Sequence, residues 1–142
     1  MIWESSASIL IAASPAVVWN ALLDGRNWGR WNPGVQWMVV EDEIAPGKLL
    51  TVKPKGAPQT AFTIADVTPQ ANLAIRVTVG PLATMRLHWT LVPLTGGTRL
   101  DQTVAISGVA ARLLLKKVAS KIATAMPDNL ERLAVLCVAS AV

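Results

Sequence analysis

The sequence predicts an α+β domain in which a curved antiparallel β-sheet wraps around one long C-terminal helix, with two short helices after the first strand. Segments in which apolar and polar residues alternate fill the middle of the chain, as is typical of antiparallel strands with one buried face. The last third instead carries apolar residues at spacings of three and four, which indicate an amphipathic helix. A sheet curled around a helix leaves a gap, so we also expect an internal cavity. The 142 residues show no linker and no repeat, so we expect one domain over residues 1–142.

The first strand and the two short helices are predicted from the opening of the chain. Alternating residues favour a strand over about 7–12. Ser14 can cap the helix that follows, and Pro15 suits its first position because the amide that proline lacks would have no partner there. We expect this helix over residues 15–23 and the second, tryptophan-rich one over residues 28–31.

The remaining strands are predicted from alternation and from the turn residues between them. In the second strand Trp37 and Glu41 share one face and Met38 lies on the other, and we expect the Trp37 face to look inward. Glycine and proline mark the turns. These strands are expected at residues 35–43, 49–55, 61–67, 73–79, 84–91 and 99–106.

The C-terminal helix is expected to begin at Ser107-Gly108 and to run for about eight turns. Pro127 lies inside it and removes one backbone hydrogen bond, so we expect either a kink or two helices divided at that point. The predicted apolar face comprises Ala111, Leu115, Val118, Ile122, Met126, Leu130, Leu133 and Cys137.

The opening also carries a family resemblance. The stretch SASILIAASPAVVWNALLD, followed by Trp28, Trp31 and the pair Asn32-Pro33, resembles the start of the START-like, polyketide cyclase/dehydrase superfamily (SRPBCC, Bet v 1-like). The resemblance implies the helix-grip fold over nearly the whole chain, with a ligand cavity between sheet and long helix. It also implies, as one activity, cyclisation or dehydration of a polyketide-type substrate.

The composition is unusually apolar for a domain of this size. Hydrophobic residues make up 52% of the chain, charged residues only 15%, and the mean hydropathy is +0.43. The excess apolar side chains could line an internal cavity, form a dimer surface, or contact lipid. The chain has no run of about 18 apolar residues, so we expect no stable membrane insertion.

The charge balance is mildly basic, with a net charge of +4 from 13 Lys and Arg against 9 Asp and Glu. Arg112, Lys116, Lys117 and Lys121 gather on the last helix, most simply as a solvated face. Because no aromatic residue accompanies them, we expect no nucleic-acid partner, while a weak attraction to anionic lipid stays open. No secretion leader is evident, so a cytoplasmic location is expected.

Catalytic equipment is sparse. The chain has no tyrosine and one histidine, His88, which alternation places on the polar side of its strand. The single cysteine, Cys137, falls on an apolar helix face and has no histidine near it in sequence. No metal-ligand spacing, phosphate loop or dinucleotide motif is present, so we expect no metal, no cofactor and no assigned catalytic residue.

Candidate ligand-binding residues are those predicted to face the space between sheet and helix. Most are aromatic or aliphatic; either they form an ordinary core, or some of them line a dry pocket for an apolar or ring-shaped ligand. Gln102 and Glu41 are the polar exceptions. Gln102 could lie near the strand's edge and bond to backbone or water, or it could point a hydrogen bond at the polar end of a ligand. Glu41 could be solvated at the strand's end, or it could be a carboxylate at the cavity mouth that acts as an acid or base. The candidates are Trp28, Trp31, Trp37, Glu41, Phe62, Met85, Trp89, Gln102, Val118, Ile122 and Met126.

Three functions compete at this point. The first is a carrier or sensor that binds a small hydrophobic or aromatic ligand, which follows from the apolar surplus and the missing catalytic groups. The second is the cyclase- or dehydratase-like enzyme that the resemblance implies. The third is a homodimeric interaction module without ligand, in which the apolar surplus lies at the subunit interface.

Overall fold

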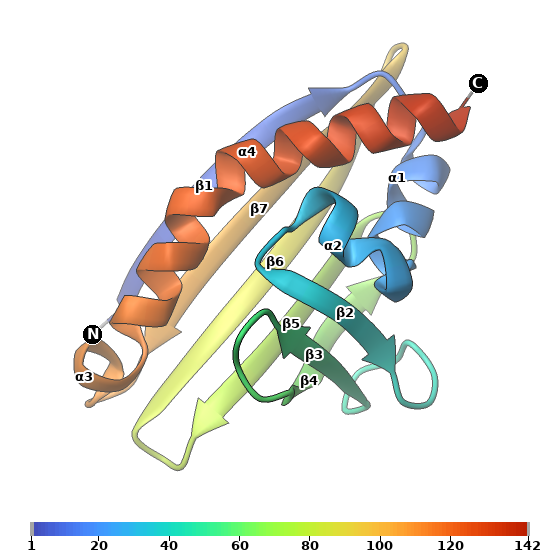
Figure 1. Ribbon diagram of the computed structural model, residues 1–142. Helices are drawn as coiled ribbons and strands as arrows, with labels where there is room; N and C mark the ends of the chain where they lie inside the picture. The colour runs from blue at the N-terminus through green and yellow to red at the C-terminus, as the bar shows by residue number, and fades with distance from the viewer. Residues whose placement is uncertain (1, 142) are drawn as a thin grey trace.

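Alternating strands and one long helix produce a curled sheet with a helix across its inner face (Figure 1). The computed structural model describes residues 2–141. The strands are β1 (Ile2–Ile11), β2 (Val35–Val40), β3 (Leu49–Pro54), β4 (Thr60–Thr68), β5 (Asn72–Val79), β6 (Ala83–Leu94) and β7 (Gly97–Ser107). The helices are α1 (Pro15–Leu23), the 3-10 helix η1 (Gly25–Asn27), α2 (Trp28–Trp31), α3 (Ala111–Leu114) and α4 (Lys116–Ala141).

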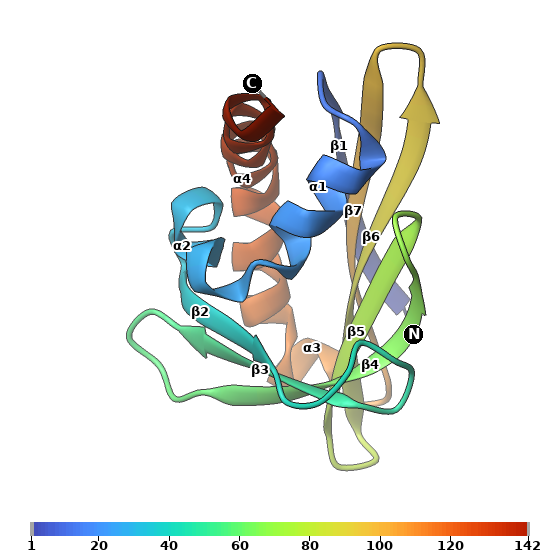
Figure 2. The same ribbon diagram turned by 90° about the vertical axis from the view of Figure 1, so that its right-hand side faces the viewer.

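The seven strands form one antiparallel sheet in the order β1-β7-β6-β5-β4-β3-β2. Figure 2 shows the long strands β1, β7 and β6 standing upright while β2, β3 and β4 curl away beneath α4. Helices α1 and α2 lie between β1 and β2 in the chain and cover the remaining part of the inner face (Figure 1). The predicted α+β helix-grip architecture is therefore confirmed.

The local signals at the first helix are confirmed as well. The Ser14 hydroxyl oxygen accepts a hydrogen bond from the Val17 amide at 3.3 Å, and Pro15 occupies the first helical position. The first strand is longer than predicted, because its polar alternation begins at Glu4 and pairs with β7 along its whole length. The strand β2 is shorter and ends at Val40 rather than at residue 43.

The inward face of β2 was predicted wrongly. Met38 is buried in the core, whereas Trp37 is half-buried on the opposite face and shares that face with exposed Val39. The pairing with β3 shifts register between Val35 and Trp37, and such a bulge re-aims the side chains that follow it.

The long helix also differs from its prediction. It does not begin at Ser107-Gly108: a short helix, α3, comes first and breaks at Leu115 before α4 begins. Pro127 lies inside α4, which continues through it as one helix, so the division at Pro127 is excluded. No helix among residues 2–141 is long and apolar enough to cross a membrane.

Candidate functional site

Three tryptophans form a cluster inside the curled sheet. Trp28 and Trp31 come from α2 and Trp89 comes from β6, and all three are buried. The ring centroids of Trp28 and Trp31 lie 5.2 Å apart, and those of Trp28 and Trp89 lie 5.8 Å apart with the rings nearly edge to face. Trp28 therefore joins the short helix to the sheet through contacts of the kind that aromatic rings favour.

The position of α2 is fixed by two local features. The Trp28 indole N–H donates a hydrogen bond at 2.8 Å to the carbonyl of Leu22, at the end of α1. Gly25 lies so close to β2 that a Cβ atom there would overlap the carbonyl oxygen of Met38. A side chain at position 25 would push η1 and α2 away from the sheet, so the glycine lets the tryptophans reach the interior.

Polar atoms without partners lie in and beside this cluster. The indole nitrogens of Trp31 and Trp89 are buried and have no hydrogen-bond partner within residues 2–141, and the same holds for the side-chain oxygen Oε1 of Gln102. Trp89 and Gln102 are directly opposite each other on β6 and β7. Buried polar groups are nearly always paired, so two donors and one acceptor left unpaired in one interior region call for an explanation.

The helix α4 covers the cluster unevenly. Leu130, Leu133 and Cys137 in its second half are fully buried, and so is Met126 near the middle of the helix. In its first half Ile122 is half-buried against the core and Val118 is 47% exposed, so Val118 does not face the interior as predicted.

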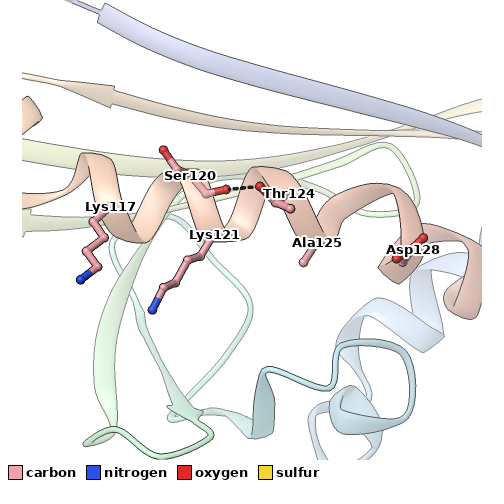
Figure 3. A pocket seen from close by; sticks show the side chains of 6 residues that line it. All are labelled: Lys117, Ser120, Lys121, Thr124, Ala125 and Asp128. Atoms are coloured by element: carbon pink, nitrogen blue, oxygen red, sulfur yellow. Dashed lines mark hydrogen bonds between the residues drawn. The ribbon is translucent and has the colours of Figure 1, made fainter.

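The interior itself is filled by side chains. Phe62, Met85 and Met126 are buried, as are the three tryptophans, so the side chains that were expected to line a cavity pack into the core. Of two hollows, one of about 670 Å³ is lined by residues of α4 alone, and one of about 370 Å³ is lined by α4 together with Arg30 of α2; no strand residue lines either of them. The residues lining the larger one are Lys117, Ser120, Lys121, Thr124, Ala125 and Asp128 (Figure 3).

The second polar candidate, Glu41, does not face the interior. It is exposed just beyond the end of β2, and its carboxylate accepts a hydrogen bond from the Thr51 hydroxyl at 2.7 Å. Its position and the outward face of Trp37 share one cause, the bulge in β2. The sequence held a signal for this result, because a carboxylate on the face of Trp37 argues that this face looks outward.

Among residues 2–141 no charged side chain is buried in the interior. Within the described chain the buried polar residues are Thr51, Thr98, Gln102 and Asn129, none of which is charged. Burial raises the pKa of the Cys137 thiol to about 11, so the thiol stays protonated at neutral pH and is a poor nucleophile. No group of three or more metal-ligating side chains occurs in the part of the chain that the structure describes.

His88 lies on the outer face of the sheet, half-buried rather than exposed as expected. Its Nε2 atom is buried and has no partner within the described residues. Burial lowers the pKa of His88, the Arg86 charge lowers it further, and Asp66 raises it in partial compensation. The imidazole is therefore neutral at pH 7 and points away from the tryptophan cluster.

The fold and the aromatic interior define a helix-grip domain. The family described as polyketide cyclase / dehydrase and lipid transport matches residues 3–137, and the chain belongs to this family. A search of curated proteins finds no match.

Solved structures agree on the fold. Protein MLL2253 from Mesorhizobium loti is 18% identical with a TM-score of 0.74, and the match covers 94% of this chain and 96% of that one. The allergen Ara h 8.0201 is 12% identical with a TM-score of 0.70, over 98% and 99% of the two chains. The ZhuI aromatase/cyclase from Streptomyces sp. R1128 is 16% identical with a TM-score of 0.69, over 96% and 94%. At such identities the likeness establishes the fold and not a shared activity.

Proposed function

We propose that the protein binds a small hydrophobic or aromatic molecule between the curled sheet and α4, beside the tryptophan cluster, as a carrier or sensor. The observation that carries the proposal is the set of unpaired buried atoms: the indole N–H groups of Trp31 and Trp89 and the Oε1 atom of Gln102. An apolar wall with a few converging polar groups is the usual character of a small-molecule site. A ligand with a hydroxyl group at one end could accept from an indole N–H and donate to Gln102 Oε1, while its ring is buried among the tryptophans.

Binding requires room that the packed interior does not offer. The first half of α4 is the element that can give way, because Val118 is already half-exposed and Ile122 only half-buried. Met126 can change rotamer to follow the shape of a ligand, since its side chain is unbranched and flexible. In this proposal the ligand displaces the first half of α4 while the second half keeps its packing.

The proposal is tested by native mass spectrometry of the freshly purified protein, followed by the same measurement after denaturation. We expect excess mass that disappears on denaturation, and the mass of the released molecule starts its identification. Trp89→Phe keeps a ring but removes the unpaired N–H, so it should lower the bound fraction.

Trp37→Phe is the matched control, because Trp37 lies outside the core on the other face of the sheet and its loss should leave binding unchanged. A protein that is bare in every preparation, and whose tryptophan fluorescence does not respond to a panel of aromatic and fatty ligands, would overturn the proposal. A bare dimer would instead favour the interaction module.

A second candidate function is a cyclase- or aromatase-like enzyme, favoured by the family match over residues 3–137. The Gln102 amide and the indole N–H groups could hold the carbonyl groups of a flexible substrate in one geometry, which can accelerate a reaction without a titrating residue. Gln102→Leu separates the two functions. Loss of turnover with retained binding supports the enzyme, whereas parallel loss of binding, with no turnover in the unsubstituted protein, supports the carrier.

A further inference from the structure

One end of the molecule exposes an unusual amount of apolar side chain. We call it the α3 tip and define it as residues 79–83, the turn between β5 and β6, together with residues 107–121, which include α3 and the start of α4. The Ala110 amide donates a hydrogen bond at 3.0 Å to the carbonyl of Leu82, so the two segments are held together. Figures 1 and 2 both show α3 beside this turn, at the end of α4 remote from the C-terminus.

The aliphatic side chains of the α3 tip are turned outward. Val109 is 91% exposed and Leu113 is 89% exposed, although apolar residues of this size normally lie in the core. Val79, Leu82, Leu114 and Val118 are each between 41% and 47% exposed. Single exposed aliphatic residues need no explanation, but a group of six at one end of a domain marks a surface that contacts an apolar partner.

The charges of the α3 tip have one sign. Arg112, Lys116, Lys117 and Lys121 are all exposed, and the two segments of the tip contain no aspartate or glutamate. None of these four cations forms an ion pair with any residue between positions 2 and 141. Lys117 and Lys121 extend from the same side of α4 (Figure 3).

The charge decides between the partners that an apolar surface could have. A second copy of the chain would bring two sets of these cations together, and like charges at an interface repel. A bilayer with anionic headgroups offers hydrocarbon to the aliphatic side chains and negative charge to the cations at the depths where each lies. We propose that the α3 tip docks peripherally on a membrane surface that carries anionic lipid, without spanning it.

The docking surface lies next to the half of α4 that the proposed function requires to open. Leu115 follows α3 directly and is buried in the core, so insertion of the neighbouring Leu113 and Leu114 into a bilayer would pull on its packing. Docking would then favour ligand exchange at the membrane. The docking itself rests only on exposure and charge and stands without the ligand.

The test is co-sedimentation of the full chain with vesicles of phosphatidylcholine alone and of phosphatidylcholine mixed with phosphatidylserine. We expect binding only to the mixed vesicles, and weaker binding as salt is added. Lys116→Gln with Lys117→Gln should weaken binding roughly 25-fold, because each cation near an anionic surface contributes about fivefold. Val109→Gln with Leu113→Gln should weaken it at least as much, because the two most exposed apolar side chains are lost.

The matched control is Val135→Gln with Val138→Gln. These valines are 71% and 40% exposed on the second half of α4, away from the cations of the α3 tip, so their replacement should leave vesicle binding unchanged. Unchanged melting temperatures for all three variants separate lost binding from lost folding. Absence of binding to mixed vesicles at low salt, equal binding to neutral vesicles, or a dimer that dissociates on Leu113→Gln would each overturn the proposal, the last in favour of a second copy as the partner.

Discussion

The two halves of α4 meet the rest of the molecule in opposite ways. In the second half Leu130, Leu133 and Cys137 have no exposed surface, and Figure 1 shows α1 and α2 beside this part of the helix. In the first half Ala119 is fully buried and so is Met126 near the middle of the helix, while Val118 and three lysines are exposed. The difference shows that the side-chain packing of one helix can vary along its length, with one half held in the core and the other half turned largely to solvent.

The largest expected effect comes from comparing a leucine in the buried second half of α4 with one in the exposed α3 tip. Leu133→Ala, in the second half, should lower the free energy of unfolding by about 2–5 kcal/mol, because it removes a buried side chain and leaves a cavity. Leu113→Ala, just before the first half, should change it by less than about 0.5 kcal/mol, because that side chain is already in water. Urea unfolding followed by tryptophan fluorescence measures both. If both substitutions lowered the free energy of unfolding equally, the α3 tip would be as tightly packed as the core. That result would contradict the difference between the two halves of α4.

A smaller loss of stability is expected at Gly25, the glycine that allows η1 and α2 to pack closely against β2. In Gly25→Ala the new methyl group meets the backbone of Met38, so η1 and α2 must shift, at a cost of about 1–3 kcal/mol or more. The emission of Trp28 and Trp31 should move to longer wavelength as water reaches them. Both effects are read from one unfolding curve.

Gly34→Ala is the matched control for Gly25→Ala. A Cβ there would meet the Asn32 side chain at 3.5 Å, an ordinary contact, and its stability should change by less than about 0.5 kcal/mol. If Gly25→Ala had the same tryptophan emission and the same free energy of unfolding as the unsubstituted protein, α2 would tolerate displacement. The region around α2 would then be packed as loosely as the α3 tip.

The sequence predicted most of the fold because the relevant signals are local. Strand alternation, the Ser14 cap and Pro15 act within a few residues, and the structure confirms the elements that they predict. The break at Leu115 could not be predicted, since the apolar spacing runs through it without interruption. At Leu115 the backbone leaves the helical conformation, with φ −120° and ψ −17°, and the side chain is buried in the core.

The candidate site was predicted less completely. Trp28, Trp31 and Trp89 lie together as their positions on helix and strand suggested, and Gln102 lies opposite Trp89. Trp37 and Glu41 were placed on the wrong face because alternation gives two faces and does not say which is inside, and a bulge then changed the register. Whether the aromatic interior is open or filled depends on how side chains of three elements pack together, which no local pattern contains.

The smallest expected effect is on the pH dependence of the free energy of unfolding, to which Cys137 in the second half of α4 contributes. Burial raises the pKa of the Cys137 thiol from 9.0 to about 11, so between pH 9 and pH 11 the unfolded chain loses this proton while the folded protein keeps it. The unfolded state then binds fewer protons, and the free energy of unfolding falls as pH rises through this window, by about 1–3 kcal/mol in all.

The chain has no tyrosine to titrate in the same range. Cys137→Ala should flatten the curve relative to the unsubstituted protein, whereas Val118→Ala, in the exposed first half, should leave its slope unchanged. Parallel curves for Cys137→Ala and the unsubstituted protein would mean that water reaches the thiol, and that the second half of α4 opens as readily as the first.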